Sequence, residues 1–443
     1  MRVLIQQRAG CRDPPSFGTM AELKTRESLQ LEAPMITIHA FAAERPPADH
    51  ASRIASVPYD VISTDEARGL AEGNPESFLH VIRPEIDLPA DTDPYADGVY
   101  EMGRMNLDRF RTQGLLVEDA EPGIYLYRLG WQGAFQTGIV CCCDAQQYRD
   151  GLVKKHEFTR PDKEDDRTRH LEVSGAHAEP VFLAFHDHEG IEELVKRDTA
   201  GAPDCSFEAE DGVTHECWRV NDPQAYVDRF SELEALYIAD GHHRSAAAER
   251  AARGRMEANP DHRGDEEYNR LLAVCFPAGE LRILPYNRVV KDRCGMSSEE
   301  LLERLREIGT VEEVQDGTPA GSGEVRVWSG DSWHSLRFDE KLIEPEDPVE
   351  SLDCAVLQRL VLGPLLGIND PRKDKRIEFV GGIRSLEELK SRAGGDGVAF
   401  SMHPTSMNEL LAVADSGMTM PPKSTWFEPK LRSGLFVHRF CEI

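Results

Sequence analysis

Long apolar runs are missing from this 443-residue sequence, in which no stretch approaches the roughly eighteen apolar residues that a membrane-spanning helix requires. The first 34 residues also lack a secretory signal, because their one apolar group, residues 3–5, is too short for a signal core. We therefore expect neither a membrane anchor nor a membrane partner. Residues 1–34 are predicted to be a disordered extension, with the folded protein beginning at Met35.

Regularly spaced cysteines are also missing. The chain has ten cysteines, and three of them are consecutive at residues 141–143, which is unlike the framework of a secreted disulfide protein. This pattern favours a reducing compartment, so we expect a cytoplasmic protein. Residues 137–143 are typical of a strand in which free cysteine behaves as a small buried apolar residue.

Positive charge is scarce. The sequence has 51 lysine and arginine residues against 79 aspartate and glutamate residues, which gives a formal net charge of −28. Such a field repels a phosphate backbone, and no helix-turn-helix with a basic recognition face is evident. Nucleic-acid binding is therefore not expected.

Short apolar strands alternate with helices from Met35 onward, which predicts a mixed α/β fold. The segment at 281–284 is expected to pair with the strand at 271–276, the helix at 245–253 is expected to end at Gly254, and Ser63 with Glu66 forms a capping box. The expected strands are 36–41, 125–129, 138–143, 180–185, 234–239, 271–276, 281–284 and 398–401, and the expected helices are 63–72, 245–253, 297–308 and 352–362.

The strand at 234–239 leads directly into the sequence DGHHR at residues 240–244, and an alanine-rich helix follows. The N-terminus of a helix offers free N–H groups and a positive dipole end, both of which bind anions. Gly241 allows close backbone approach, and Arg244 can contact two phosphate oxygens. The alternative is a polar helix start that caps itself. Clustering of these residue types favours a functional site, with Asp240, His242 and His243 as candidate catalytic residues.

Residues 238–244, IADGHHR, resemble the phosphate-binding motif of the ParB/sulfiredoxin superfamily, most closely its free-serine kinase branch. From about Met35 to Phe440 the chain is similar to a prokaryotic family called domain of unknown function 1015. That similarity rests on five blocks, at 57–63, 155–157, 160–163, 240–244 and 420–427. It implies a ParB/sulfiredoxin-like nucleotide-binding core with large insertions over residues 35–310, and a C-terminal α/β subdomain over residues 311–443 that contributes a loop to the site.

A charged loop carries His156 and Glu157. Glu157 can accept a proton from a substrate hydroxyl, while the cations Arg160, Lys163 and Arg167 can neutralise phosphate charge. The alternative is a solvated surface loop. No cysteine pair at zinc-ligand spacing is nearby, so we predict Mg²⁺ held by carboxylates and nucleotide phosphates, without a dedicated protein metal site.

Other candidates lie at strand ends and in a proline-stiffened loop at 420–432. That loop can deliver Lys423 to a phosphate at little ordering cost, although a structural clasp by Trp426 is an alternative. Asp60 is a candidate for the nucleotide pocket or, alternatively, caps the helix near Thr64. The expected pocket-lining residues are Tyr59, Asp60, His156, His403 and Trp426.

These patterns predict a nucleotide-dependent phosphotransferase acting on a small hydroxylated metabolite. Phosphoryl transfer needs positioning and charge neutralisation, which suits this set of residues. Resemblance to the serine-kinase branch implies free L-serine as the leading substrate, and ATP or ADP, with CTP as a further candidate, as the nucleotide. A phosphate-ester hydrolase and a non-catalytic nucleotide switch remain alternatives. The oligomeric state is not predicted, but the four candidate loops are expected to converge.

Overall fold

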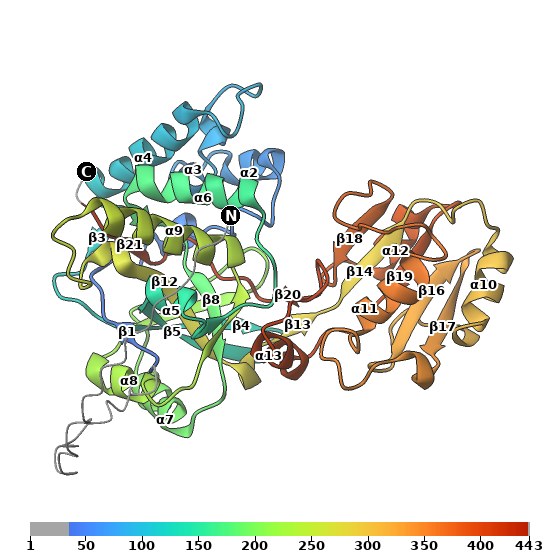
Figure 1. The fold of residues 1–443 in the computed structure, drawn as a ribbon. Helices are drawn as coiled ribbons and strands as arrows, with labels where there is room; N and C mark the ends of the chain where they lie inside the picture. Colours follow the sequence, from blue (N-terminus) through green and yellow to red (C-terminus); the bar gives the residue numbers. More distant parts are fainter. Residues whose placement is uncertain (1–34, 442–443) are drawn as a thin grey trace, which may run out of the picture. The chain divides into compact units, whose positions relative to one another are not determined.

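The computed structural model describes residues 35–441, so the extension expected over residues 1–34 lies outside the described residues. A nine-stranded mixed sheet forms its first layer (Figure 1). Its order is β6 (Val153–Lys154), β11 (Leu236–Asp240), β8 (Val181–Phe185), β12 (Arg270–Pro277), β5 (Ala134–Asp144), β4 (Tyr125–Trp131), β10 (Thr214–Arg219) and β9 (Cys205–Glu208), with β1 (Ile38–His39) also pairing with β5.

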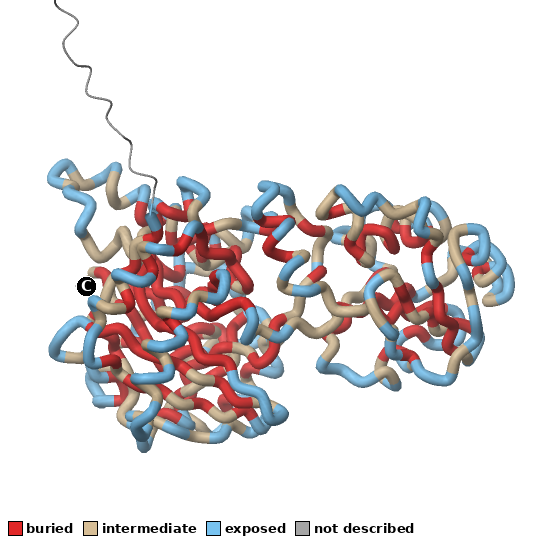
Figure 2. The backbone as a smooth tube through the Cα atoms, turned by 90° about the horizontal axis from the view of Figure 1, so that it is seen from below, coloured by how far each residue is buried: buried red, intermediate tan, exposed pale blue. Residues whose placement is uncertain are grey.

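This sheet is mixed because β11 runs parallel to β6 and β12 runs parallel to β8, whereas its other pairs are antiparallel. The expected hairpin is confirmed as β4 and β5, which pair along their length. The central strands are rich in apolar, β-branched and cysteine residues, and these side chains are buried on both faces of the sheet. Figure 2 shows the buried residues gathered in the interior and the exposed residues along the outside of the described chain.

Two layers cover the nine-stranded sheet. One face packs against helices α9 (His242–Ala258), α7 (Glu189–Asp198) and α8 (Pro223–Phe230). The opposite face packs against the C-terminal segment at residues 427–436. Beyond α9, helix α6 (Pro161–Ser174) packs on α9, and α4 (Asp97–Thr112) packs on α6 (Figure 1). The described part of the chain is therefore mixed α/β, as the sequence predicts.

A second sheet has six strands, all antiparallel to their neighbours. The domain boundary expected between residues 310 and 311 falls inside β15, and the six-stranded sheet also includes β14, which precedes helix α10 (Ser298–Arg306) and β15 in the chain. Its order is β15 (Gly309–Val314), β17 (Ser332–Phe338), β16 (Glu324–Ser329), β19 (Val398–Ser401), β14 (Tyr286–Val290) and β18 (Ile377–Gly381).

Two further expectations are wrong. The strand at 271–276 does not pair with 281–284, because β12 takes β5 and β8 as neighbours while β13 (Ile283–Leu284) pairs with β20 (Trp426–Phe427). The helix after residue 244 does not end at Gly254, since α9 continues to Ala258. The residues after Gly254 are strong helix formers, and one glycine costs a helix only about 1 kcal/mol.

The capping box is confirmed: Ser63 caps α2 (Thr64–Ala71), and Ser63 and Glu66 exchange hydrogen bonds. Asp60 therefore does not cap this helix, and its carboxylate is exposed. Among residues 35–441, no helix combines the length and apolar character needed to span a membrane.

Candidate functional site

The DGHHR sequence forms a strand-to-helix turn, in which β11 ends at Asp240 and α9 begins at His242. Gly241 occupies the left-handed region with φ of 94°, and an added Cβ would lie 3.1 Å from the Arg244 guanidinium. As N-cap, Gly241 offers no side-chain acceptor to the helix, while Asp240 Oδ1 accepts the Gly241 N–H at 2.8 Å. The turn therefore does not cap itself as the sequence alternative supposed, and the first N–H groups of α9 lack a side-chain cap.

Asp240 forms an ion pair with Lys430. Lys430 Nζ donates to Asp240 Oδ2 at 2.8 Å, and the two side chains are only 13% and 25% exposed. Burial alone would raise the pKa of Asp240, but Lys430 and Arg244 hold it well below its usual range. The ammonium of Lys430 also lies 4.9 Å from the Trp426 ring centroid. Asp240 is therefore ionised at neutral pH, and its ion pair with Lys430 holds the lysine beside the turn.

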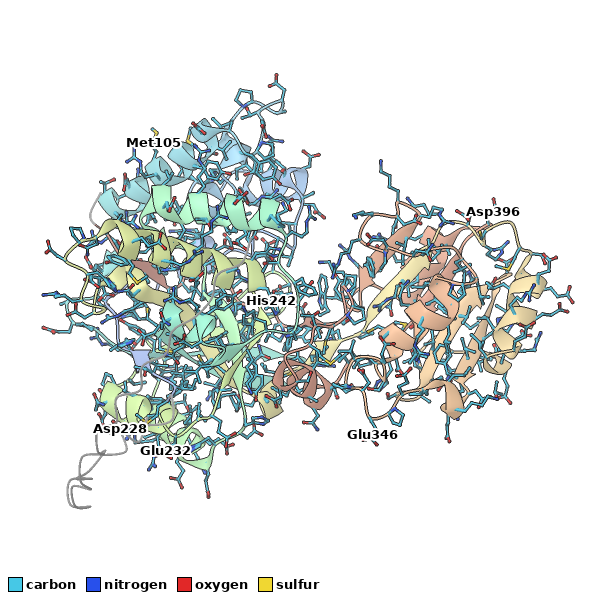
Figure 3. The ribbon with its side chains drawn as sticks, in the orientation of Figure 1. Met105, Asp228, Glu232, His242, Glu346 and Asp396 are labelled. Carbon is cyan, nitrogen blue, oxygen red and sulfur yellow. The ribbon has the colours of Figure 1, made fainter. Side chains whose placement is uncertain are left out.

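His242, labelled in Figure 3, begins α9 and meets His156 edge to face, with ring centroids 4.5 Å apart. The backbone N–H of His156 donates to His242 Nε2 at 3.5 Å, so the neutral His242 ring carries its proton on Nδ1. That Nδ1 atom lies 3.9 Å from Glu157 Oε2. Burial lowers both imidazole pKa values, that of His156 to about 4, although Asp240 opposes the shift. Both rings are therefore neutral near pH 7.

His156 is buried, and neither of its ring nitrogens makes a hydrogen bond of ordinary geometry to another described residue, although the nearby Ile238 backbone acts to raise its pKa against the larger effect of burial. Buried polar groups are normally paired, and an exception calls for a physical reason. Such a ring retains the capacity to bind a ligand at this site.

Glu157 and Lys423 bring two more loops together. Met420 N–H donates to the His156 carbonyl at 2.8 Å, which ties the loop at 420–432 to the charged loop. Burial raises the pKa of Glu157 above its usual value even though Lys423 opposes the rise, and the Glu157 side chain is still 38% exposed. Lys423 lies over the ring of Tyr286, which together with Glu157 raises the pKa of the lysine against the effect of burial.

The carboxylate of Asp60 lies within the field of four cationic or basic groups. After burial, which acts in the opposite direction, it is the largest influence on Arg244, and it raises that side chain's pKa. It also raises the pKa of His243, Lys423 and Lys430. The loop after the first strands therefore reaches the same site as the turn.

Glu179 links the segments that carry Tyr59, Arg167 and Ser433 next to the site. It is buried and accepts hydrogen bonds from Tyr59 N–H at 3.3 Å and Ser433 Oγ at 3.1 Å, and Arg167 Nη1 lies 3.7 Å away. The Arg167 guanidinium covers the Tyr59 ring at 4.0 Å from its centroid. Arg244 donates to the Pro180 carbonyl, and its Nε has no hydrogen-bond partner among the described residues.

A small cavity of about 30 Å³ adjoins this layer and is lined by Arg167, Glu179 and Arg244 among others. A larger cavity of about 260 Å³ lies elsewhere, between α7 and the sheet, with Arg128, Ile191 and Glu280 in its wall. None of the candidate site residues lines the larger cavity, so the geometry of the turn, not cavity size, identifies the site.

The cations at the start of α6 contribute less directly than expected. The Arg160 N–H donates to His243 Nε2 at 3.0 Å, but the Arg160 guanidinium is exposed and pairs with Asp162. Lys163 Nζ donates to the Tyr95 hydroxyl at 2.9 Å. Arg160 and Lys163 nevertheless lie close enough to lower the pKa of His243, after the larger effect of burial.

Two residues that were expected to line the pocket, His403 and Trp426, have their described contacts away from the DGHHR turn or only partly at it. The described electrostatic partner of His403 is Asp353, and no described contact joins His403 to the turn. Trp426 donates from Nε1 to Glu428 Oε2 at 2.9 Å and packs edge to face on Tyr286. Trp426 therefore has the clasp contacts of the structural alternative and also stacks with the lysine that reaches Asp240.

Sequence reasoning gave no individual role to Lys430 or Glu179. Lys430 is 190 residues from Asp240, and Glu179 directly precedes the strand expected at residues 180–185. A carboxylate or an ammonium next to a proline, as in Glu179-Pro180 and Pro429-Lys430, was the one local signal available.

The assembled groups can bind and neutralise a polyanion. Three cations, Arg244, Lys423 and Lys430, share the site with the uncapped end of α9, while Asp60 and Glu157 supply partly accessible carboxylates. Mg²⁺ is usually held by carboxylates together with phosphate oxygens, so Asp60 and Glu157 have the chemistry that such an ion would require.

A family model described as "Protein of unknown function (DUF1015)" matches residues 38–355. No curated protein matches the sequence. Solved structures give distant similarities: SbnI with a C-terminal truncation from Staphylococcus aureus (13% identity, 68% of this chain and 87% of that chain, TM-score 0.37), a conserved hypothetical protein from Pyrococcus furiosus (14%, 68% and 95%, 0.34) and a free serine kinase in complex with AMP (14%, 65% and 86%, 0.32).

Proposed function

The chain thus belongs to the DUF1015 family, and we propose that it is a nucleotide-dependent phosphotransferase acting on a small hydroxylated metabolite. One observation carries the proposal: three loops from distant parts of the sequence, at residues 59–60, 156–157 and 420–432, meet at the turn at residues 240–244 with cations, carboxylates and neutral imidazoles. Phosphoryl transfer is catalysed mainly by positioning and by charge stabilisation around the phosphate, which requires groups from several directions.

In this proposal the nucleotide phosphates bind at the N-terminus of α9. The first N–H groups of the helix have no side-chain cap, the missing Cβ of Gly241 leaves room for the Arg244 guanidinium beside the turn, and Arg244 keeps an unpaired Nε among the described residues. Lys423 and Lys430 add charge from the C-terminal loop. The resemblance of the DGHHR sequence to the phosphate-binding motif of the ParB/sulfiredoxin superfamily favours ATP or ADP as the nucleotide, with CTP as a further candidate. In this proposal Mg²⁺ would be held by the nucleotide phosphates and Asp60.

Glu157 is a better general base than Asp240 in this proposal. Asp240 is bound to Lys430 and to the Gly241 N–H, and its pKa is depressed, so it is a weak proton acceptor. Glu157 has a raised pKa, is partly exposed and faces the protonated Nδ1 of His242. Its role is to accept the proton of the substrate hydroxyl as the phosphoryl group is transferred.

The acceptor is a small hydroxylated metabolite, and free L-serine is the leading candidate because the turn resembles the serine-kinase branch. The test is product analysis by ³¹P NMR and mass spectrometry after incubation with Mg²⁺, one of ATP, ADP or CTP, and either L-serine or a panel of hydroxylated metabolites. A new phosphate monoester formed only with both nucleotide and acceptor is the expected result.

Other outcomes select the alternatives. Release of phosphate from phosphoserine without nucleotide identifies a phosphate-ester hydrolase and overturns the proposal. Nucleotide-dependent thermal stabilisation with no turnover of any acceptor identifies a nucleotide switch and overturns it as well.

A further inference from the structure

Three cysteine thiols meet in the core of the nine-stranded sheet, away from the candidate functional site. The Sγ atoms of Cys141, Cys143 and Cys275 all lie within 4.8 Å of one another, and all three residues are fully buried. None of the three belongs to a motif that the proposed function uses.

Strand geometry explains the grouping. Residues two apart on a strand point to the same face, so Cys141 and Cys143 of β5 share a face while Cys142 points to the other. In the adjacent β12, Ala273 lies opposite Cys141 and Cys275 lies opposite Ile139, which puts Cys275 diagonally beside Cys141. The three thiols belong to one buried cluster, and Cys142 belongs to the cluster on the opposite face.

The donor set is sulfur alone. Among the described residues, no histidine or carboxylate completes this group, and the surrounding buried cluster is apolar. Structural zinc sites almost always have four protein ligands, whereas thiolate sulfur also selects copper(I). A buried, three-sulfur environment in an apolar core therefore suits a soft ion of low coordination number better than zinc.

We propose that Cys141, Cys143 and Cys275 form a binding site for a soft monovalent metal ion of the copper(I) class. The ion joins β5 to β12 through their side chains, in addition to the backbone pairing of the two strands. Because the thiols are inaccessible in the folded protein, the ion is acquired as the sheet forms.

The test uses the full-length protein produced in copper-supplemented or zinc-supplemented medium, purified without oxygen and washed with a chelator. We expect about one copper ion per chain by elemental analysis, and a copper X-ray absorption spectrum with sulfur ligands only. Copper-free protein from the supplemented culture, retained zinc in place of copper, or nitrogen and oxygen ligands would overturn the proposal.

Variants separate the site from adventitious thiol binding. Cys141→Ser and Cys275→Ser should each reduce bound copper by about tenfold or more, since even outer-shell changes have effects of that size. Cys142→Ser, on the same strand but the opposite face, and Cys294→Ser, at an exposed position, should retain it. Circular dichroism verifies folding of each variant. Equal loss from folded Cys142→Ser and Cys275→Ser, or retention by folded Cys275→Ser, contradicts the assignment.

Discussion

Arg244 shows how a single side chain serves both fold and proposed chemistry, because its Nη1 binds the Pro180 carbonyl while its Nε has no described partner. We predict that Arg244→Ala weakens nucleotide binding by about 1.5–3 kcal/mol, the value of a charge-assisted hydrogen bond. Isothermal titration calorimetry measures the affinity. Arg253→Ala, at an exposed position on the same helix, is the matched control and should bind normally. Equal affinities for both variants would rule out phosphate binding by Arg244.

Glu157 allows a separate prediction about turnover. Glu157→Gln should slow the reaction by about a hundredfold or more and leave nucleotide affinity nearly unchanged, as expected when a general base is lost. Asp162→Asn, at an exposed position in the next helix, is the control. Normal turnover by Glu157→Gln would transfer the base role to Asp240 or Asp60, the other carboxylates whose charge acts on Glu157.

The raised pKa of Glu157 also sets a pH dependence. A general base works deprotonated, so kcat should fall as pH falls through this raised value, and the acid limb should lie above the pH at which an ordinary glutamate titrates. A pH–rate profile of the wild type, compared with Glu157→Gln, checks this. The acid limb should disappear in the variant, and an unchanged limb would assign it to another group.

At the scale of elements, the β11–α9 turn requires glycine at residue 241, whereas helix α9 gains nothing from the glycine at residue 254. Gly241→Ala forces a side chain into positive φ and toward the Arg244 guanidinium, so it should destabilise the protein by about 1–2 kcal/mol and weaken nucleotide binding. Gly254→Ala, within α9 and with open space around its Cβ, should instead stabilise it by about 0.5–1 kcal/mol. Thermal unfolding compares the two, and a destabilised Gly254→Ala with an unaffected Gly241→Ala would contradict this account of the turn.

The contact between the C-terminal segment and the turn rests on the Lys430–Asp240 pair. Removing one partner of a mostly buried pair leaves an uncompensated charge, so Lys430→Met should lower stability by about 3 kcal/mol at neutral pH. The double variant Lys430→Met with Asp240→Asn should recover part of that loss, and chemical denaturation measures the coupling. Additive effects of the two changes would show that the pair does not couple the segment to the turn.

That pair also has a defined pH dependence. The folded pKa of Asp240 is depressed, so its contribution to stability is fully present above the unfolded value and is lost as pH falls through the folded one. The share of the free energy of unfolding that this pair contributes should therefore be lost only below about pH 4, the unfolded pKa of aspartate.

For the whole molecule, local patterns predicted the strand-to-helix turn, the β4–β5 hairpin and the α2 capping box because each depends on residues close in sequence. The pairing of β13 with β20 could not be predicted in this way, since its strands are far apart in the chain. Lys430 was missed for the same reason: its partner is 190 residues away. The hairpin expected after β12 does not form because β12 pairs with β5 and β8, and β13 pairs with the distant β20. Helix α9 continues beyond Gly254 because the residues that follow have high helix propensity.

The central claim is that nucleotide phosphates bind at the start of α9, and a crystal structure with Mg²⁺ and a bound nucleotide tests it most directly. The account predicts phosphate oxygens on the N–H groups after Gly241, within hydrogen-bond distance of Arg244 and close to Lys423 or Lys430, with Glu157 facing the terminal phosphate. Phosphates bound elsewhere, such as in the cavity beside Ile191 and Glu280, with the turn empty, would contradict it.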